Sequence, residues 1–252
     1  MTKLVRFLHN QKTSYGILEG TEIQPIAGDL FGKHEPAGAK LALSAVKLLY
    51  PVEAPKIFAV GLNYKSHLGT RKAPESPEIF YKPVSALQNP GDPIVTPPDS
   101  RNMHFEGEIV AVIGKRASKI SVEEAKDVVF GVTCGNDVSE RDWQHGANKD
   151  LQWWRAKGSD TFAPIGPLVV TGIDYGKLLL KTKVNGEVVQ EQYTSDLLFD
   201  IPAIVSYISR WATLFPGDII FTGTPGSTRK LNPGDVVEVD IEGIGVLSNP
   251  VE

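Results

Sequence analysis

The sequence predicts a mainly β fold with some α-helix, an α+β protein in which a small β module precedes a larger domain. Three observations predict it. Short runs of β-branched and aromatic residues recur along the chain, and 24 Gly and 18 Pro stand largely where turns would separate them. Asn185-Gly186 joins two such runs, and this dipeptide is typical of a tight hairpin. Helical signals are confined to two segments.

The first fifty residues have the pattern of a separate β module. Strands are expected over 4–7, 14–18 and 23–26, with a turn at residues 19–21 between the last two. Prolines at 51 and 55 mark the seam with the rest of the chain. We therefore divide the chain into an N-terminal β module, residues 1–52, and a main domain, residues 53–252.

The main domain is also expected to be mostly β. Its strands are predicted at 57–60, 108–113, 128–134, 178–184, 187–189, 219–221 and 236–241. A capping box from Ser121 to Glu124 predicts a helix that includes residues 125–129. Asp200 is expected to cap a second helix that starts at Pro202. The apolar face of this helix would be formed by Ile204, Val205, Ile208, Trp211 and Ala212.

Composition excludes several classes of protein. A net charge of -4 provides no basic surface, so no nucleic-acid partner is expected. The single cysteine, Cys134, allows neither an intramolecular disulfide nor a thiolate metal cage. The first residues lack the apolar core of a signal peptide, and no stretch approaches the ~20 apolar residues of a membrane span. We expect a cytoplasmic protein with no membrane partner.

One segment, residues 104–114, carries two carboxylates into an apolar strand. Side chains of a strand alternate between faces, so Glu106 and Glu108 share a face with Val110 and Val112. Both faces are apolar toward the end of the segment, which indicates a buried strand. Carboxylates are costly to bury there unless they are paired or bind a metal ion. The alternative is a solvated strand end with two ordinary glutamates.

A third carboxylate follows another predicted strand end. The apolar run 128–134 leads directly to Asp137. Three carboxylates without a Cys or His cluster favour a hard ion, Mg²⁺, Mn²⁺ or Ca²⁺, over structural zinc. His104 is predicted on the same face as the two glutamates, either as a ligand or neighbour of the ion, or as a hydrogen-bonded structural residue. The sequence therefore predicts a metal site.

Several short segments resemble the fumarylacetoacetate hydrolase family over nearly the whole chain. Each motif alone is weak, whereas their joint order and spacing are specific. The matching segments are residues 61–67, 80–83, 101–114, 136–144, 156–158, 183–186 and 221–225.

The resemblance implies a mixed β-sandwich roll that forms a homodimer and uses one divalent ion, Mg²⁺ or Mn²⁺. The implied metal ligands are Glu106, Glu108 and Asp137. The implied catalytic residues are His67, on a mobile loop, and Lys157, beside the metal. The implied substrate-binding residues are Arg141, Gln144 and Thr222.

The implied substrate is a 2-oxo or 2,4-dioxo carboxylic acid. A divalent ion would act as a Lewis acid and stabilise the enolate that forms when the adjacent bond breaks. Lys157 would supply the third positive charge against three carboxylates, which predicts a near-neutral site that accepts an anion. The first hypothesis is therefore hydrolytic C–C bond cleavage of the acylpyruvate or fumarylacetoacetate type.

One position departs from the pattern of this family. Many hydrolytic members carry a glutamate three residues after the catalytic histidine, where this chain has Thr70, which cannot act as a carboxylate base. Glu75 or Glu78 could replace it, although Pro74 and Pro77 restrict the loop. The second hypothesis is an oxaloacetate-type decarboxylase or a 2-hydroxy-dienedioate isomerase, which uses the same metal site. The third is a non-catalytic protein that binds a metal ion and a dicarboxylate.

Overall fold

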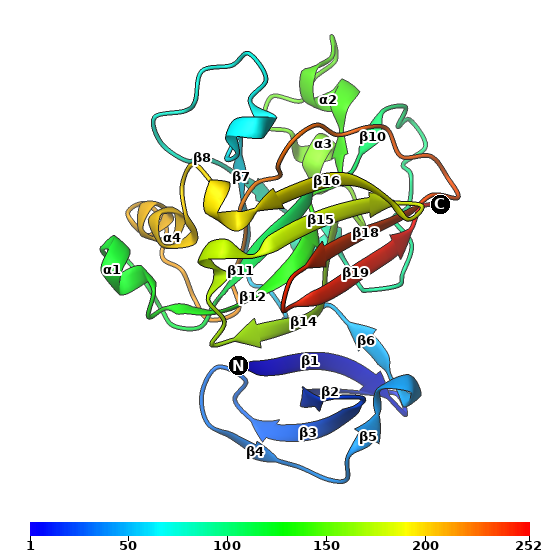
Figure 1. Cartoon of the computed structure of the whole chain (residues 1–252), viewed down its shortest axis with the longest axis vertical. Helices are drawn as coiled ribbons and strands as arrows, with labels where there is room; N and C mark the ends of the chain where they lie inside the picture. The colour runs from blue at the N-terminus through cyan, green and yellow to red at the C-terminus, as the bar shows by residue number, and fades with distance from the viewer.

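The structure is a computed structural model that describes all 252 residues. Its strands are β1 (Thr2–His9), β2 (Lys12–Glu19), β3 (Glu22–Gly28), β4 (His34–Pro36), β5 (Leu41–Ala42), β6 (Lys47–Leu49), β7 (Ile57–Gly61), β8 (Glu78–Lys82), β9 (Leu87–Gln88), β10 (Met103–His104), β11 (Gly107–Ile113), β12 (Val129–Asn136), β13 (Ser139–Glu140), β14 (Ala163–Thr171), β15 (Leu179–Val184), β16 (Glu187–Tyr193), β17 (Ile219–Phe221), β18 (Val236–Ile241) and β19 (Gly245–Pro250). Its α-helices are α1 (Val122–Ala125), α2 (Arg141–His145), α3 (Trp154–Gly158) and α4 (Ile201–Ser209). Strands dominate, and the predicted mainly β fold with some α-helix is confirmed (Figure 1).

One large sheet connects the two parts of the chain. Its main path has the strand order β4-β3-β2-β1-β14-β12-β11-β17-β7-β8. β1 and β14 pair antiparallel, with Thr2 opposite Thr171 and Leu4 opposite Val169. The N-terminal module, which lies below β14 in Figure 1, thus extends the sheet of the main domain. The division of the chain near residue 52 stays a prediction.

A second sheet packs on the large one. Its order is β16-β15-β18-β19, and its strands contact β11, β12 and β14. One core cluster joins the two sheets and includes Ile109 and Ile113 of β11 with Val239 of β18. Val110 and Val112 lie in a second cluster. The predicted alternation along this strand is therefore confirmed, and β11 is buried along its whole length.

The turn and cap signals lie where the sequence predicts them. Asn185 and Gly186, with φ of 53° and 81°, connect β15 to β16. Ser121 forms the capping box of α1, and the Asp200 side chain caps α4. The extent of the first helix is corrected: α1 is four residues long and does not reach residue 129, where β12 begins.

The second predicted helix is also shorter than expected. Ile204, Val205 and Ile208 are buried as predicted. However, α4 ends at Ser209, so the expectation that Trp211 continues the apolar face is wrong, and this side chain is 81% exposed. No helix of the molecule combines the length and apolar character that crossing a membrane requires.

Two short helices were not predicted from the sequence. α2 and α3 pack against each other, and α3 also contacts β8 and β13. Both lie in the upper part of the molecule in Figure 1. They carry Arg141, Gln144 and Lys157, so they bring three of the predicted site residues together.

Candidate metal centre and active site

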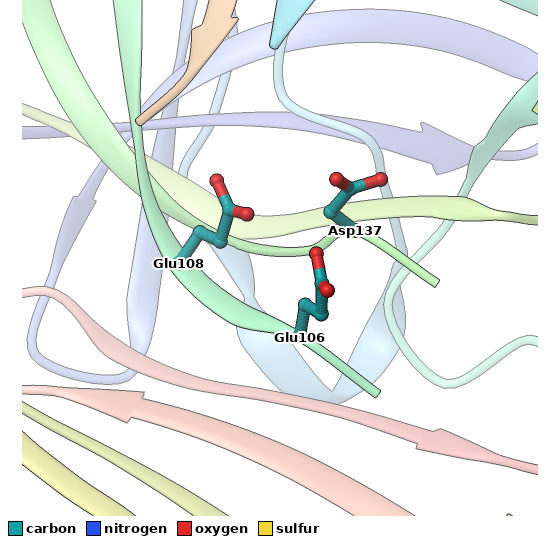
Figure 2. Close-up of side chains that lie close together, drawn as sticks. All are labelled: Glu106, Glu108 and Asp137. Atoms are coloured by element: carbon teal, nitrogen blue, oxygen red, sulfur yellow. The ribbon is translucent and has the colours of Figure 1, made fainter. Parts of the chain in front are cut away.

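Figure 2 shows three carboxylates at the ends of two paired strands. Glu106 directly precedes β11 and Glu108 lies within it, whereas Asp137 directly follows β12. Antiparallel pairing places Glu108 opposite Gly135, which brings Asp137 beside Glu106. One oxygen of each carboxylate lies within 4.8 Å of the others, and all three residues are buried. Their burial excludes the alternative of a solvated strand end.

Two buried lysines compensate part of this negative charge. Lys157 Nζ donates to Glu106 Oε2 at 2.7 Å and to Asp137 Oδ2 at 2.6 Å. Lys82 Nζ donates to Asp137 Oδ1 at 2.5 Å and also to the backbone carbonyl of Lys157. Lys157 therefore lies beside the carboxylates, where the resemblance implied it. Lys82 was not predicted, and the only available signal was its place in the matching segment 80–83.

The three carboxylates differ in their electrostatic surroundings. Burial raises the pKa of Glu108 well above its usual range, and the charges of Asp137 and Glu106 raise it further. The only hydrogen bond to this carboxylate comes from the Gly223 backbone N–H, at 2.7 Å. Burial acts in the same direction on Glu106, but the charges of Lys157 and Arg141 outweigh it and hold that pKa well below its usual range. Protein cations therefore compensate Glu106 and Asp137 but not Glu108.

This donor set fits a divalent cation. It consists of carboxylate oxygens only, which are the ligands that Mg²⁺ and Mn²⁺ prefer. A buried carboxylate without a cationic partner, such as Glu108, is costly unless an ion completes the site. Glu106, Glu108 and Asp137 are the residues that would hold such an ion.

The formal charge of the site differs from the near-neutral value expected from the sequence. The three carboxylates face three side-chain cations, because Lys82 and Arg141 join Lys157. A divalent ion would therefore leave two excess positive charges. The correction arises because the sequence alone did not show that Lys82 and Arg141 contact the carboxylates. A positive site favours an anionic ligand.

A cavity of about 520 Å³ opens over the carboxylates. Arg141, which lines it, donates from Nη2 to Glu106 Oε1 at 2.6 Å and to Thr228 Oγ1 at 2.9 Å. Its Nη1 donates to Gln144 Oε1 at 2.7 Å. Arg141, Gln144 and Lys157 thus share one cavity, as their predicted roles require. The cavity volume lies within the range of small-molecule sites.

Comparison with known proteins agrees with this geometry. A family model described as the fumarylacetoacetate (FAA) hydrolase C-terminal domain matches residues 56–252. The chain belongs to the fumarylacetoacetate hydrolase family. A second model, described as Rv2993c-like, N-terminal, matches residues 2–51. The resemblance inferred from the sequence motifs is therefore confirmed.

Three similar proteins illustrate the range of the family, and two of them have an activity in their names. Protein Rv2993c of Mycobacterium tuberculosis is 45% identical over 231 residues, which cover 90% of this chain and 86% of that protein. The mitochondrial oxaloacetate tautomerase fahd2 of Xenopus laevis is 40% identical over 84% of this chain and 70% of its own length. The crystal structure of 2-hydroxyhepta-2,4-diene-1,7-dioate isomerase from Mycobacterium marinum is 41% identical, with a TM-score of 0.92 over 100% of this chain and 98% of that one.

His67, for which the resemblance implied a catalytic role, lines the cavity. Its Nδ1 lies 2.6 Å from the carbonyl oxygen of Gly226, and its Nε2 lies 3.9 Å from Glu106 Oε1. A carbonyl oxygen can only accept a hydrogen bond, so Nδ1 carries a proton, and in the neutral tautomer Nε2 is the nitrogen that can accept one. The fold therefore presents a proton acceptor to the carboxylate side of the cavity.

No further carboxylate takes the place of the glutamate that many hydrolytic family members have after this histidine. The only acidic residues that line the cavity are Glu106 and Asp137. Glu75 forms an ion pair on the exposed surface, and Glu78 is exposed at the start of β8. Thr70 is exposed and does not line the cavity. Neither Glu75 nor Glu78, the two alternatives raised from the sequence, is thus positioned as a base.

The structure does not bring the Thr222 side chain to the cavity. This residue is fully buried, and its hydroxyl donates to the Ile109 backbone carbonyl at 2.8 Å. Two other threonines, Thr224 and Thr228, line the cavity instead. Sequence reasoning missed them because the direction of each hydroxyl depends on how the segment after β17 crosses β11.

His104 lies next to Thr228 and outside the carboxylate cluster. Its Nδ1 is 2.9 Å from Thr228 Oγ1, and its Nε2 is 2.9 Å from Asn102 Oδ1. Burial and the charge of Arg141 lower the pKa of His104 to about 4, so the ring is neutral near pH 7. Its place in this hydrogen-bond network agrees with the structural alternative raised from the sequence.

Proposed function

We propose that this protein is a divalent-metal-dependent enzyme that moves a proton between carbon and oxygen, or between two carbons, of a 2-oxo carboxylic acid. It would thus be a keto–enol tautomerase or a double-bond isomerase. The surroundings of His67 carry the proposal: Nε2 faces the carboxylate cluster, and no carboxylate apart from the proposed metal ligands lines the cavity to help activate water. This observation moves the isomerase part of the second hypothesis ahead of hydrolysis.

The carboxylate cluster would hold Mg²⁺ or Mn²⁺. When bound, such an ion supplies a Lewis acid for the 2-oxo carboxylate group of the substrate. Lys157 bridges Glu106 and Asp137, so it keeps two of the ligands at a fixed separation and offsets their charge. Arg141 is held by Glu106 and Gln144 and would bind the substrate's carboxylate.

His67 would carry the proton. Its Nε2 takes a proton from the carbon next to the keto group, the C–H electron pair forms a C=C bond, and the carbonyl electron pair moves to oxygen. The imidazolium that results lies near the Glu106 carboxylate, 3.9 Å away, which stabilises its charge. Return of the proton to oxygen gives the enol. Return to a more distant carbon of a conjugated acid gives the double-bond isomer.

The names of two similar proteins support this reaction class. One is an oxaloacetate tautomerase, and the other is a 2-hydroxyhepta-2,4-diene-1,7-dioate isomerase. Both names describe the movement of a proton without hydrolysis.

Hydrolytic cleavage of an acylpyruvate is the second candidate. It is favoured by the same nitrogen, because Nε2 of His67 faces an open cavity and can also accept a proton from water. Decarboxylation of oxaloacetate would use the same substrate anion, with loss of CO₂ in place of a proton. The three reactions can be separated by their products.

A turnover assay tests the proposal. Purified protein supplemented with Mg²⁺ or Mn²⁺ would receive enol-oxaloacetate, acetylpyruvate and fumarylpyruvate in parallel, with EDTA controls. We expect EDTA-sensitive loss of the enol's ultraviolet absorbance, without CO₂ release and without cleavage of the dioxo acids. Cleavage of a dioxo acid without tautomerisation would establish the hydrolase instead. CO₂ release alone would indicate a decarboxylase, and no turnover of any of these acids would leave a double-bond isomerase or a binding protein.

A further inference from the structure

The cavity over the carboxylates is lined by two arginines with different partners. Arg141 is paired with Glu106. Arg71 lines the same cavity but forms no ion pair, and its side chain donates only to backbone carbonyls. Arginine keeps its charge at all working pH values. The cavity therefore contains a positive charge that no protein carboxylate pairs with.

Arg71 is held by the same turn that carries His67. Its Nε donates to the Leu68 carbonyl at 3.1 Å, and its Nη2 donates to the His67 carbonyl at 3.3 Å. The two N–H groups of Nη1 have no acceptor in the protein. The guanidinium is thus positioned by the fold, yet it keeps donors available for a ligand.

Other residues of the cavity lining do not supply an acid for Arg71. The rings of His145 and Trp153 pack edge to face with centroids 6.2 Å apart, and Trp153 packs in the same way on Phe80 at 5.6 Å. Burial, together with the charges of Arg141 and Arg71, lowers the pKa of His145, so both arginines act on this part of the cavity. The cavity lining therefore combines aromatic rings and two arginines with the carboxylates.

We propose that Arg71 binds a second carboxylate of the substrate, so that this chain selects 2-oxo dicarboxylic acids over 2-oxo monocarboxylic acids. The inference rests on the proposed function for the other end of the substrate, where the 2-oxo acid group meets the carboxylate cluster. The planar guanidinium offers N–H groups in the geometry that a carboxylate accepts. The formal charge of the site also favours a dicarboxylate. Arg71 adds one positive charge to the excess of the ion-loaded site, and a dianion compensates more of this excess than a monoanion does.

The test uses pairs of acids that differ only in their terminal group. These are oxaloacetate with 2-oxobutanoate, and 2-oxoglutarate with 2-oxopentanoate. Dissociation constants for the Mg²⁺-loaded protein would be measured by titration calorimetry. The proteins compared are the wild type, Arg71→Ala, Arg71→Lys and Arg116→Ala, which removes an exposed arginine outside the cavity.

We expect the wild type to prefer the dicarboxylate in at least one pair. Arg71→Ala should reduce this preference about tenfold or more, which is the effect of losing a charge-assisted hydrogen bond. Arg71→Lys should retain part of the preference, because it keeps the charge but not the planar donors. Arg116→Ala should retain all of it, and circular dichroism would confirm that each variant is folded.

Two further outcomes separate this proposal from the proposed reaction. A preference that Arg71→Ala removes would support the role of Arg71 even if no acid is turned over, because the readout is binding. The proposal is overturned if the wild type shows no preference in either pair or binds none of the acids. It is equally overturned if folded Arg71→Ala keeps the full preference.

Discussion

The ammonium of Lys82 lies 2.5 Å from Asp137 Oδ1, and both side chains are almost completely enclosed by the protein. Burial lowers the pKa of Lys82, while the charge of Asp137 acts in the opposite direction. Each group therefore depends on its partner, since removal of one leaves a buried charge with less compensation. This pair also fixes one oxygen of a proposed metal ligand.

Replacing Lys82 should destabilise the protein. We expect Lys82→Met to lower the free energy of unfolding by about 3 kcal/mol, because it breaks a buried ion pair and leaves Asp137 with Lys157 as its only cationic partner. Urea denaturation measures this. The matched control is Lys72→Met, which removes a pair with Glu75 whose side chains are 85% and 88% exposed and should change little. Equal effects of both substitutions would contradict the prediction.

Glu108→Gln should separate metal binding from stability. The substitution removes one carboxylate of the cluster, so Mn²⁺ affinity should fall by about 100-fold or more, given that changes outside the ligand shell alone cost about 10–100-fold. Stability in EDTA should not fall, because burial already raises the pKa of Glu108 and disfavours its charged form. Mn²⁺ titration followed by electron paramagnetic resonance, and denaturation in EDTA, measure the two effects. Wild-type Mn²⁺ affinity in this variant would refute the metal assignment.

His67→Ala should remove proton transfer and leave the metal site intact. The imidazole is the proposed base, and a positioned base contributes about 10²–10⁴ in rate. Turnover of enol-oxaloacetate should fall within that range, while Mn²⁺ affinity should stay within about twofold of the wild type. If turnover persists at the wild-type rate, another group must carry the proton.

A carboxylate at position 70 should shift the reaction toward hydrolysis. Thr70→Glu places a glutamate three residues after His67, the spacing found in many hydrolytic members of the family. We expect cleavage of acetylpyruvate to rise relative to tautomerisation, because a carboxylate beside the histidine can help it to activate water. Thr70→Gln is the matched control, since it has the size of glutamate without the base. If Thr70→Glu leaves the ratio of the two activities unchanged, position 70 does not decide between hydrolysis and tautomerisation.

Two threonines should respond differently to the same substitution. Thr222→Val removes a hydroxyl that bonds to the Ile109 carbonyl, so it should lower stability by about 1 kcal/mol with little change in KM. Thr228→Val removes a cavity hydroxyl that accepts from Arg141, so it should raise KM about tenfold with a smaller effect on stability. Steady-state kinetics and urea denaturation distinguish them. A larger rise in KM for Thr222→Val than for Thr228→Val would restore the role first implied for Thr222.

Local signals in the sequence account for much of the fold. The alternation along β11 and the Asn185-Gly186 turn involve residues that are adjacent in the chain, so neither needs knowledge of the rest of the molecule. The helices α2 and α3 escaped prediction because five residues each are too few to show a helical period. Trp211 was misplaced for a related reason, since apolar spacing does not reveal where a helix ends.

The candidate site likewise has features that local sequence predicts and features that only the fold determines. Glu106 and Glu108 share a strand, and Asp137 ends an apolar run, so the sequence by itself determined the carboxylate set and its preference for a hard cation. Only the tertiary structure decided which groups surround that set. Lys82 is 55 residues from Asp137 in the chain, and Gly226 is 159 residues from His67. Contacts of this kind arise from strand order and loop path, so no local pattern records the positive charge of the site, the accepting nitrogen of His67 or the unpaired Arg71.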